Sequence, residues 1–280
     1  MKTVAIVGVG LIGGSFALAL RKAGFAGEIT GVSSARAIES GIRTGAISRG
    51  TTLEEAAASA DLIYLAQTVD RILETIETLG PMLRPGCLVT DAGSTKAAIV
   101  DQAQRFMGDG QFLGGHPMAG KEQRGAEAAD PSLFENRPYL LTPVYKETAR
   151  TAEFRDWLAR LGANVIEMSA DEHDETVALT SHLPQVVSTA LAATLARHDN
   201  PYLNQVFGRG LLDMTRLALS DIEIWRGILA SNEANVKSGL DALIASLTEV
   251  RNSIGTEEMG EIFSEGSRFS TSLRNLPSTS

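Results

Sequence analysis

The stretch TVAIVGVGLIGGSF, residues 3–16, decides the fold of this 280-residue chain. An apolar run of β character leads into glycines spaced as G-x-G-x-x-G, and a helical pattern follows. The first glycine of such a turn permits a tight bend, the second lets the backbone approach a pyrophosphate, and the third allows close packing of helix on strand. The N-terminus of the helix then faces the phosphates. We therefore predict a dinucleotide cofactor at Gly8, Gly10, Leu11, Ile12 and Gly13.

The first half of the chain alternates short β-rich runs with helical or loop segments. This alternation is typical of right-handed βαβ units and predicts an α/β fold, with a Rossmann-type doubly wound parallel sheet. The expected strands are 3–7, 28–32, 62–66, 88–91, 112–114, 139–142 and 164–168, and a helix is expected near 148–161.

From Ser169 onwards the pattern is only helical. Ser169 and Glu172 match the S-x-x-E capping box that starts many helices, and Ser220 and Glu223 repeat it. An apolar stripe at helical spacing follows each of the two boxes. We predict a boundary after residue 169, with a dinucleotide-binding domain over 1–169 and an all-α substrate and dimerisation domain over 170–280.

The two apolar stripes can be buried in two ways. They can pack against a second copy of the chain, which makes a homodimer our preferred prediction, or within one copy as a self-contained helical bundle. With both domains assigned, we expect that 280 residues leave no room for a further domain.

Composition excludes several classes of protein. The formal net charge is −9, with 25 Lys and Arg against 34 Asp and Glu, so we expect neither nucleic acid nor an anionic membrane surface as a partner. Cys87 is the only cysteine, which excludes an intrachain disulfide and makes cytoplasmic localisation the default. No apolar run is long enough to cross a membrane. We expect no secretory signal, because the first residues run directly into an apolar strand.

The end of the second expected strand indicates which dinucleotide is bound. An NAD site usually has an acidic residue there for the ribose 2′-hydroxyl. This chain has Ser33, Ser34 and Arg36 instead, while Glu28 lies at the opposite end of the strand. Two hydroxyls and an arginine suit a 2′-phosphate, so we predict NADP as the preferred cofactor, with NAD as the alternative.

Two segments follow strands at the sheet edge where reacting groups gather. One is TDAGSTK, residues 90–96, which contains Ser94, and the other is GGHPMAG, residues 114–120, which contains His116. Small residues surround His116, so we predict an open position and a catalytic role. The four histidines form no compact H-x-x-x-H pattern, and we predict no metal site. His173 lies in an acidic run, residues 171–175, expected to be the first turn of a helix.

Together these motifs resemble the prephenate/arogenate dehydrogenase (cyclohexadienyl dehydrogenase) family. The segments that resemble it are GLIGGS (10–15), DAGSTK (91–96), HPMAG (116–120), SHLPQ (181–185) and TRLA (215–218), with Trp225. The resemblance implies oxidative decarboxylation of prephenate or arogenate on the route to tyrosine. Gln67-Thr68-Val69 departs from the family, whose members commonly have a proline there.

The resemblance also implies roles for individual residues. His116 matches the catalytic histidine that accepts the proton of the ring hydroxyl, and Ser94 matches the serine that orients it. Arg216 matches the arginine that holds a substrate carboxylate, for which a bidentate fork is suited. His182 and Trp225 match residues that line the substrate pocket.

Lys121 and Glu122 follow HPMAG, where the substrate side chain is expected to end. Lys121 suits a carboxylate and Glu122 suits the ammonium of arogenate, and the alternative is an ordinary surface pair. Two alternatives for the whole protein remain open at this point: another Rossmann dehydrogenase with a helical second domain, of 3-hydroxyacid dehydrogenase or imine reductase type, and a non-catalytic regulator that senses NADP.

Overall fold

The computed structural model describes residues 1–121 and 123–275, which divide into two compact units. The first unit contains Met1–Asp174 together with Asp221–Ser231. The second contains Glu175–Ser220 and the described residues from Asn232 onwards. Glu122, a predicted substrate residue, lies outside the described residues.

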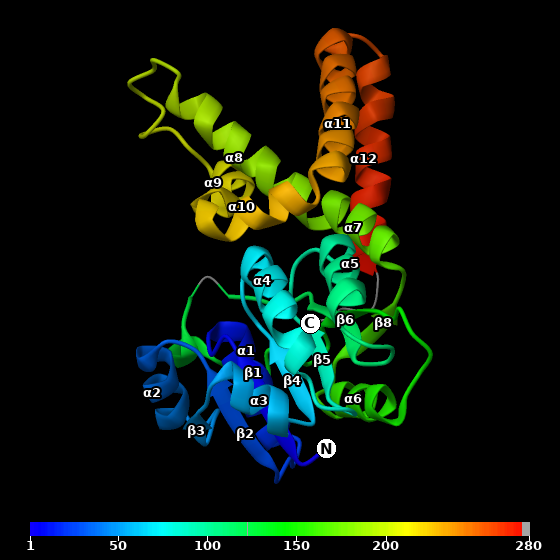
Figure 1. Cartoon of the computed structure of the whole chain (residues 1–280). Coiled ribbons are helices and arrows are strands. Elements are labelled where there is room, and N and C mark those ends of the chain that lie inside the picture. The colour runs from blue at the N-terminus through cyan, green and yellow to red at the C-terminus, as the bar shows by residue number, and fades with distance from the viewer. Residues whose placement is uncertain (122, 276–280) are drawn as a thin grey trace. The chain divides into compact units, whose positions relative to one another are not determined.

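An eight-stranded sheet forms the centre of the first unit, in the order β3-β2-β1-β4-β5-β6-β7-β8 (Figure 1). Chain order moves outwards from β1 to β3 and then returns to the other side of β1, so the direction of winding reverses between β1 and β4. The predicted Rossmann-type fold is confirmed. The strands are β1 (Thr3–Val7), β2 (Glu28–Val32), β3 (Arg49–Gly50), β4 (Leu62–Leu65), β5 (Leu88–Asp91), β6 (Phe112–Pro117), β7 (Pro138–Thr142) and β8 (Asn164–Glu167).

The sheet is parallel except at one pairing. β7 runs antiparallel to β6, with Gly115 opposite Leu141, and β8 is again parallel to β7. The predicted parallel sheet therefore has one antiparallel pairing, at this edge. Parallel neighbours need a crossover, usually an α-helix, whereas the described part of the segment between β6 and β7 forms only a short 3-10 turn at Ala126–Ala128.

Helices cover both faces of the sheet (Figure 1). On one face lie α1 (Leu11–Lys22), α2 (Ala35–Arg43) and α6 (Ala149–Arg160). On the other lie α3 (Leu53–Ser59), α4 (Val69–Leu79) and α5 (Ala97–Phe106). Each face has its own apolar core. In the first, Phe16 stacks on Tyr64 with ring centroids 4.0 Å apart, and in the second Ile72 and Ile99 are fully buried.

Helix α10 (Ile222–Ser231) belongs to the first unit although it is distant in sequence. Its Ile228 is buried in the second core, and the hydroxyls of Ser231 and Thr95 lie 2.8 Å apart. The Asp221 carboxylate accepts the N–H of Glu223 at 3.0 Å and so starts this helix. The predicted capping box of Ser220 and Glu223 is therefore wrong, because Asp221 takes the capping role.

The predicted box of Ser169 and Glu172 is confirmed at the start of α7 (Ala170–Val177). The Ser169 hydroxyl accepts the N–H of Glu172 at 3.2 Å, and the Glu172 carboxylate accepts the N–H of Ser169 at 2.9 Å.

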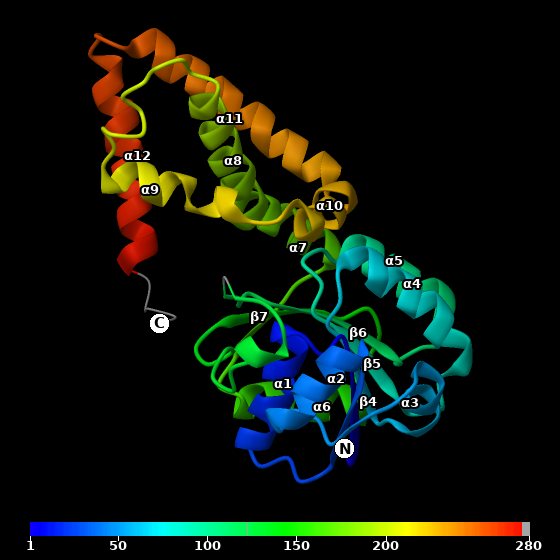
Figure 2. The same ribbon diagram turned by 90° about the vertical axis from the view of Figure 1, so that its left-hand side faces the viewer.

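The second unit is helical, as predicted (Figure 2). A π-helical turn at Ala178–His182 precedes α8 (Leu183–Ala196), where Pro184 lacks the N–H that the carbonyl of Thr180 would otherwise receive. Further along, α9 (Arg209–Thr215) is followed by a 3-10 turn at Arg216–Leu219, and α11 (Glu233–Ser253) and α12 (Glu258–Asn275) form a helical hairpin. In the described part of the chain, no helix combines the length and apolar character needed to cross a membrane.

Candidate active site

The glycine turn between β1 and α1 has the geometry of a phosphate-binding loop. Gly8 adopts a φ of +96°, and a side chain there would collide with the carbonyl oxygen of Ala66. At Gly13 an added Cβ would collide with the carbonyl oxygen of Gly8, so this glycine permits the close approach of helix and strand. Space is open around Gly10, which leaves room for a ligand against the backbone.

The N-terminus of α1 offers hydrogen-bond donors to an anion. Its N-cap residue is Gly10, which has no side chain to satisfy the first N–H groups, and no acidic residue lies in the first turn. The N–H groups of Leu11, Ile12 and Gly13 therefore lie at the positive end of the helix. The residues present fit the pyrophosphate of a dinucleotide.

The end of β2 leads into the exposed residues Ser33, Ser34 and Arg36. Ser34 is the N-cap of α2, since its hydroxyl accepts the N–H of Ala37 at 3.4 Å. This contact is a structural role for Ser34, and the hydroxyl still has a proton to donate. Arg36 lies in the first turn of α2, which contains no acidic residue.

Asp91, the last residue of β5, ties together the two loops that follow β5 and β6. Its carboxylate accepts the N–H groups of Gly93 at 2.8 Å and Gly115 at 3.0 Å, and it forms an ion pair with Lys96. The Lys96 ammonium also donates to the carbonyl oxygen of Gly115 at 2.8 Å. Both charged side chains are fully buried. Partly exposed Ser94 lies in the loop that this network holds.

His116 lies inside strand β6, one residue after Gly115, and its side chain is buried. It is 8% exposed, so the prediction of an open imidazole is wrong. The reason is a second imidazole: Nδ1 of His116 lies 2.9 Å from Nε2 of His173. Nδ1 of His173 in turn lies 2.8 Å from Oδ1 of Asp174.

Asp174 also caps helix α5. Its Oδ1 accepts the N–H of Lys96 at 2.7 Å, and its Oδ2 accepts the N–H of Ala97 at 3.0 Å. His173 is fully buried between these groups. Burial lowers the pKa of His173 below its usual value, and the neighbouring Asp174 carboxylate opposes this effect without cancelling it.

Two further predicted residues lie in the first unit. Lys121 is exposed and donates to the Asp130 carboxylate at 2.7 Å. This contact lowers the pKa of Asp130. Trp225, on α10, is partly buried and packs against the second core.

The remaining predicted residues lie in the second unit and are described within it. His182 ends the π-helical turn and is 1% exposed, with its Nδ1 3.3 Å from the amide nitrogen of Asn232. Arg216 begins the 3-10 turn after α9 and is exposed.

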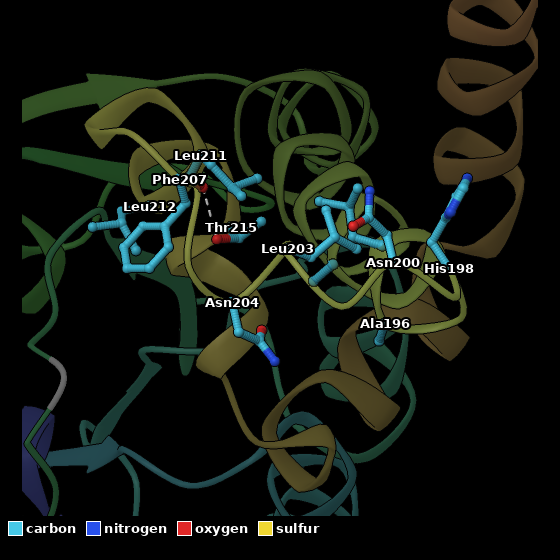
Figure 3. Close-up of a pocket in the computed structure, with 11 residues that line it drawn as sticks. Ala196, His198, Asn200, Leu203, Asn204, Phe207, Leu211, Leu212 and Thr215 are labelled. Atoms are coloured by element: carbon cyan, nitrogen blue, oxygen red, sulfur yellow. Dashed lines mark hydrogen bonds between the residues drawn. The ribbon is translucent and has the colours of Figure 1, made fainter.

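The second unit also contains a cavity of about 440 Å³ (Figure 3). None of the predicted site residues that the structure describes lines it, and its described lining includes no lysine or arginine that would attract a carboxylate. We therefore do not assign the substrate to this cavity. It is lined by Ala192, Leu195, Ala196, His198, Asn200, Leu203, Asn204, Phe207, Leu211, Leu212 and Thr215.

Comparison with known proteins identifies the family. The nucleotide-binding domain of prephenate dehydrogenase matches residues 16–167, and the prephenate dehydrogenase dimerization domain matches residues 169–265. The chain belongs to the prephenate dehydrogenase family. It is therefore an NAD(P)-dependent oxidoreductase, and this assignment replaces both alternatives left open by the sequence.

Individual members of the prephenate dehydrogenase family resemble the chain over most of its length. The enzyme from Lactococcus lactis is 35% identical over 280 residues, which cover 96% of this chain and 76% of that protein. Prephenate dehydrogenase from Aquifex aeolicus, solved with hydroxyphenyl propionate and NAD+, superposes with a TM-score of 0.91 at 33% identity over 98% of both chains. Arogenate dehydrogenase from Synechocystis gives a TM-score of 0.82 at 28% identity, over 98% of this chain and 100% of that one.

The sequence did not predict a role in the site for His173 and Asp174, which were expected only to lie in the first turn of a helix. A signal was nevertheless present. The capping box fixes the start of α7, and His173 and Asp174 then lie four residues before the apolar Val177 and Ala178, on the same helix face. All four of these residues are buried.

Proposed function

We propose that this member of the family catalyses the oxidative decarboxylation of prephenate or arogenate, on the route to tyrosine, and prefers NADP. The observation that supports the proposal best is the position of His116. It lies near the carboxyl end of a strand in a nucleotide-binding sheet, where the reacting groups of such folds gather, and its Nδ1 is held by a buried partner.

His116 acts as the general base. Its Nε2 accepts the proton of the ring hydroxyl, with Ser94 orienting both groups, and the bound oxidised nicotinamide supplies the acceptor for the hydride that leaves the same carbon. The ring carboxylate departs as carbon dioxide, and its electron pair enters the ring. Aromatisation supplies a large driving force, so the protein has mainly to position the ring and hold its carboxylates.

Charged and aromatic residues bind the substrate in this proposal. Arg216 holds a carboxylate, for which its planar fork is suited, and His182 and Trp225 contact the substrate. Lys121 suits a side-chain carboxylate, although it must then exchange its contact with Asp130. Glu122 suits the ammonium group of arogenate.

The preference for NADP rests on the residues after β2. Arg36 is exposed in the first turn of α2, where the positive end of the helix adds to its charge. Two serine hydroxyls precede it, and no carboxylate stands at the end of the strand to bind a ribose 2′-hydroxyl.

The chain acts as a homodimer in this proposal, through its C-terminal helices. Large apolar side chains on α11 and α12 are exposed, among them Leu247 at 56%, Phe263 at 73% and Phe269 at 66%. Large apolar side chains left exposed on a helical hairpin are typical of an association surface. Light scattering over a range of concentrations tests this point, and a monomer throughout would contradict it.

An assay of both substrates with both cofactors tests the proposed function. We expect turnover of prephenate or arogenate, with a lower KM for NADP than for NAD. His116→Asn should reduce kcat by about 100-fold or more and leave cofactor binding intact, because the base is lost and the glycine loop is not. Absence of turnover with both substrates would reject the function, and a lower KM for NAD would reject the cofactor preference.

A further inference from the structure

A continuous chain of hydrogen-bonding groups runs from His116 to a carboxylate. Nδ1 of His116 lies 2.9 Å from Nε2 of His173, and Nδ1 of His173 lies 2.8 Å from Oδ1 of Asp174. The three side chains are 8%, 0% and 2% exposed, so bulk water does not compete for these contacts.

The carboxylate determines which nitrogen carries the proton in each ring. Asp174 accepts two backbone N–H groups, from Lys96 and Ala97, and an ionised carboxylate can only accept. Nδ1 of His173 must therefore be the N–H donor to Asp174. In a neutral imidazole the other nitrogen is then an acceptor, so Nε2 of His173 accepts from Nδ1–H of His116.

Burial is the main reason why His173 stays in this neutral form. Burial lowers the pKa of His173, and so does the positive charge of Lys96, while the carboxylates of Asp174 and Asp91 act in the opposite direction. With His173 neutral, both contacts are hydrogen bonds when each imidazole carries its proton on Nδ1.

We propose that His173 and Asp174 are positioning residues, which hold His116 in the tautomer with its proton on Nδ1 and thereby make Nε2 the base. The inference rests on the proposed function of His116. During the reaction the hydroxyl proton moves to Nε2, the hydride leaves for the oxidised nicotinamide, and the carboxylate leaves as carbon dioxide. The same proton then returns from Nε2 to the oxygen of the aromatic product, so the histidine pair ends the reaction as it began.

A purely structural role for Asp174 does not account for the whole arrangement. Capping of α5 needs acceptors for the N–H groups of Lys96 and Ala97, and these need no imidazole beside them. Burying two imidazoles in contact costs desolvation, which their mutual hydrogen bond and the carboxylate offset. The arrangement resembles a catalytic triad in which a second imidazole lies between the catalytic histidine and the carboxylate.

The tautomer of His116 can be observed directly by NMR of enzyme labelled with 15N-histidine. The spectrum is recorded with NADP bound and without substrate, and His116→Asn assigns the signals. We expect a protonated Nδ1 and an unprotonated Nε2 in the wild-type enzyme. In Asp174→Asn the amide nitrogen that takes the place of Oδ1 gives up the N–H of Lys96 and donates to Nδ1 of His173, which reverses both rings and places the proton of His116 on Nε2.

The kinetics of three variants and one control test whether a misplaced proton on His116 removes the base. Asp174→Asn should lower kcat by about 100-fold or more, since a misplaced tautomer removes the base, with cofactor KM changed by less than about twofold. His173→Gln retains an acceptor for Nδ1–H of His116 and should keep kcat within about fivefold. In the His173→Gln background, Asp174→Asn should cause little further loss of kcat. Asp171→Asn, at an exposed carboxylate of the same turn, is the matched control and should leave kcat and KM unchanged.

Each outcome has a definite meaning. A wild-type His116 with its proton on Nε2, or an Asp174→Asn variant with an unchanged tautomer, would overturn the positioning role. Equal loss of kcat in Asp174→Asn with and without His173→Gln would also overturn it, since the loss would then come from the helix cap. Because the NMR measurement involves no substrate, it stands even if turnover of prephenate and arogenate is absent, which would reject only the proposed function.

Discussion

Replacing Lys96 by methionine removes a charge from the centre of the first unit and nearly preserves the volume of the side chain. Lys96 and Asp91 are both 0% exposed. Without the ammonium, the Asp91 carboxylate keeps only the N–H groups of Gly93 and Gly115, and the carbonyl oxygen of Gly115 loses its donor from Lys96. Removing one partner of a buried ion pair typically costs about 3–5 kcal/mol.

Urea unfolding followed by tryptophan fluorescence measures this loss in the relevant part of the chain. The protein has two tryptophans, Trp157 and Trp225, and both belong to the first unit. For a slope of about 3 kcal/mol per M, the midpoint of Lys96→Met should fall by roughly 1–2 M. Lys22→Met is the control. Its ion pair with Glu135 is exposed, with side chains 51% and 42% accessible, and should contribute about 0–1 kcal/mol.

A double variant separates charge from packing. In Asp91→Asn with Lys96→Met, no buried charge is left unpaired, so we expect a higher midpoint than for Lys96→Met alone. If the double variant is no more stable than the single one, the loss comes from packing. If Lys96→Met unfolds at the same midpoint as Lys22→Met, the ion pair does not contribute to stability and the reasoning is refuted.

Three other predictions follow from the site and its surroundings. Arg216→Ala should raise the substrate KM by about 30-fold or more, because a charged contact is worth roughly 2–5 kcal/mol, and equal damage to cofactor affinity would show that Arg216 has another role. Cys87 is 1% exposed and burial raises the pKa of its thiol to about 11, so a thiol reagent at pH 8 should modify it only when urea unfolds the protein; equal rates in both states would contradict this. Burial also lowers the pKa of His173 below 6.5, so the unfolded chain binds more protons and the free energy of unfolding should fall as pH decreases below 6.5. Urea midpoints between pH 5 and pH 7 measure this slope, which should be shallower in His173→Gln.

The parts of the fold predictable from sequence are those that local patterns determine. The glycine turn and the box of Ser169 and Glu172 each involve residues within a few positions of one another, and both have the predicted geometry. The two-residue strand β3 is too short to produce a periodic pattern. The antiparallel direction of β7 is a non-local property, and the one sequence sign of it was the lack of helical periodicity between β6 and β7.

In the candidate site, too, local features could be predicted from the sequence and non-local contacts could not. His116 could be proposed from its motif and its place after a strand, but the motif does not indicate that the ring is buried. Its partner His173 is 57 residues away along the chain, and only the folded sheet brings α7 against the end of β6. Asp174 likewise caps a helix whose first residue is 77 positions earlier. Pairings at such separations depend on topology rather than on local pattern.

The return of α10 to the first unit limits how this protein can be divided. The chain passes from one unit to the other three times, after Asp174, after Ser220 and after Ser231. A fragment that ends at Asp174 would lack Ile228 and leave its place in the second core open to water. Producing the nucleotide-binding half alone therefore requires residues 221–231 to be spliced on or supplied as a peptide. A chimera that takes its helical half from a relative must likewise keep residues 221–231 from the same protein as the sheet.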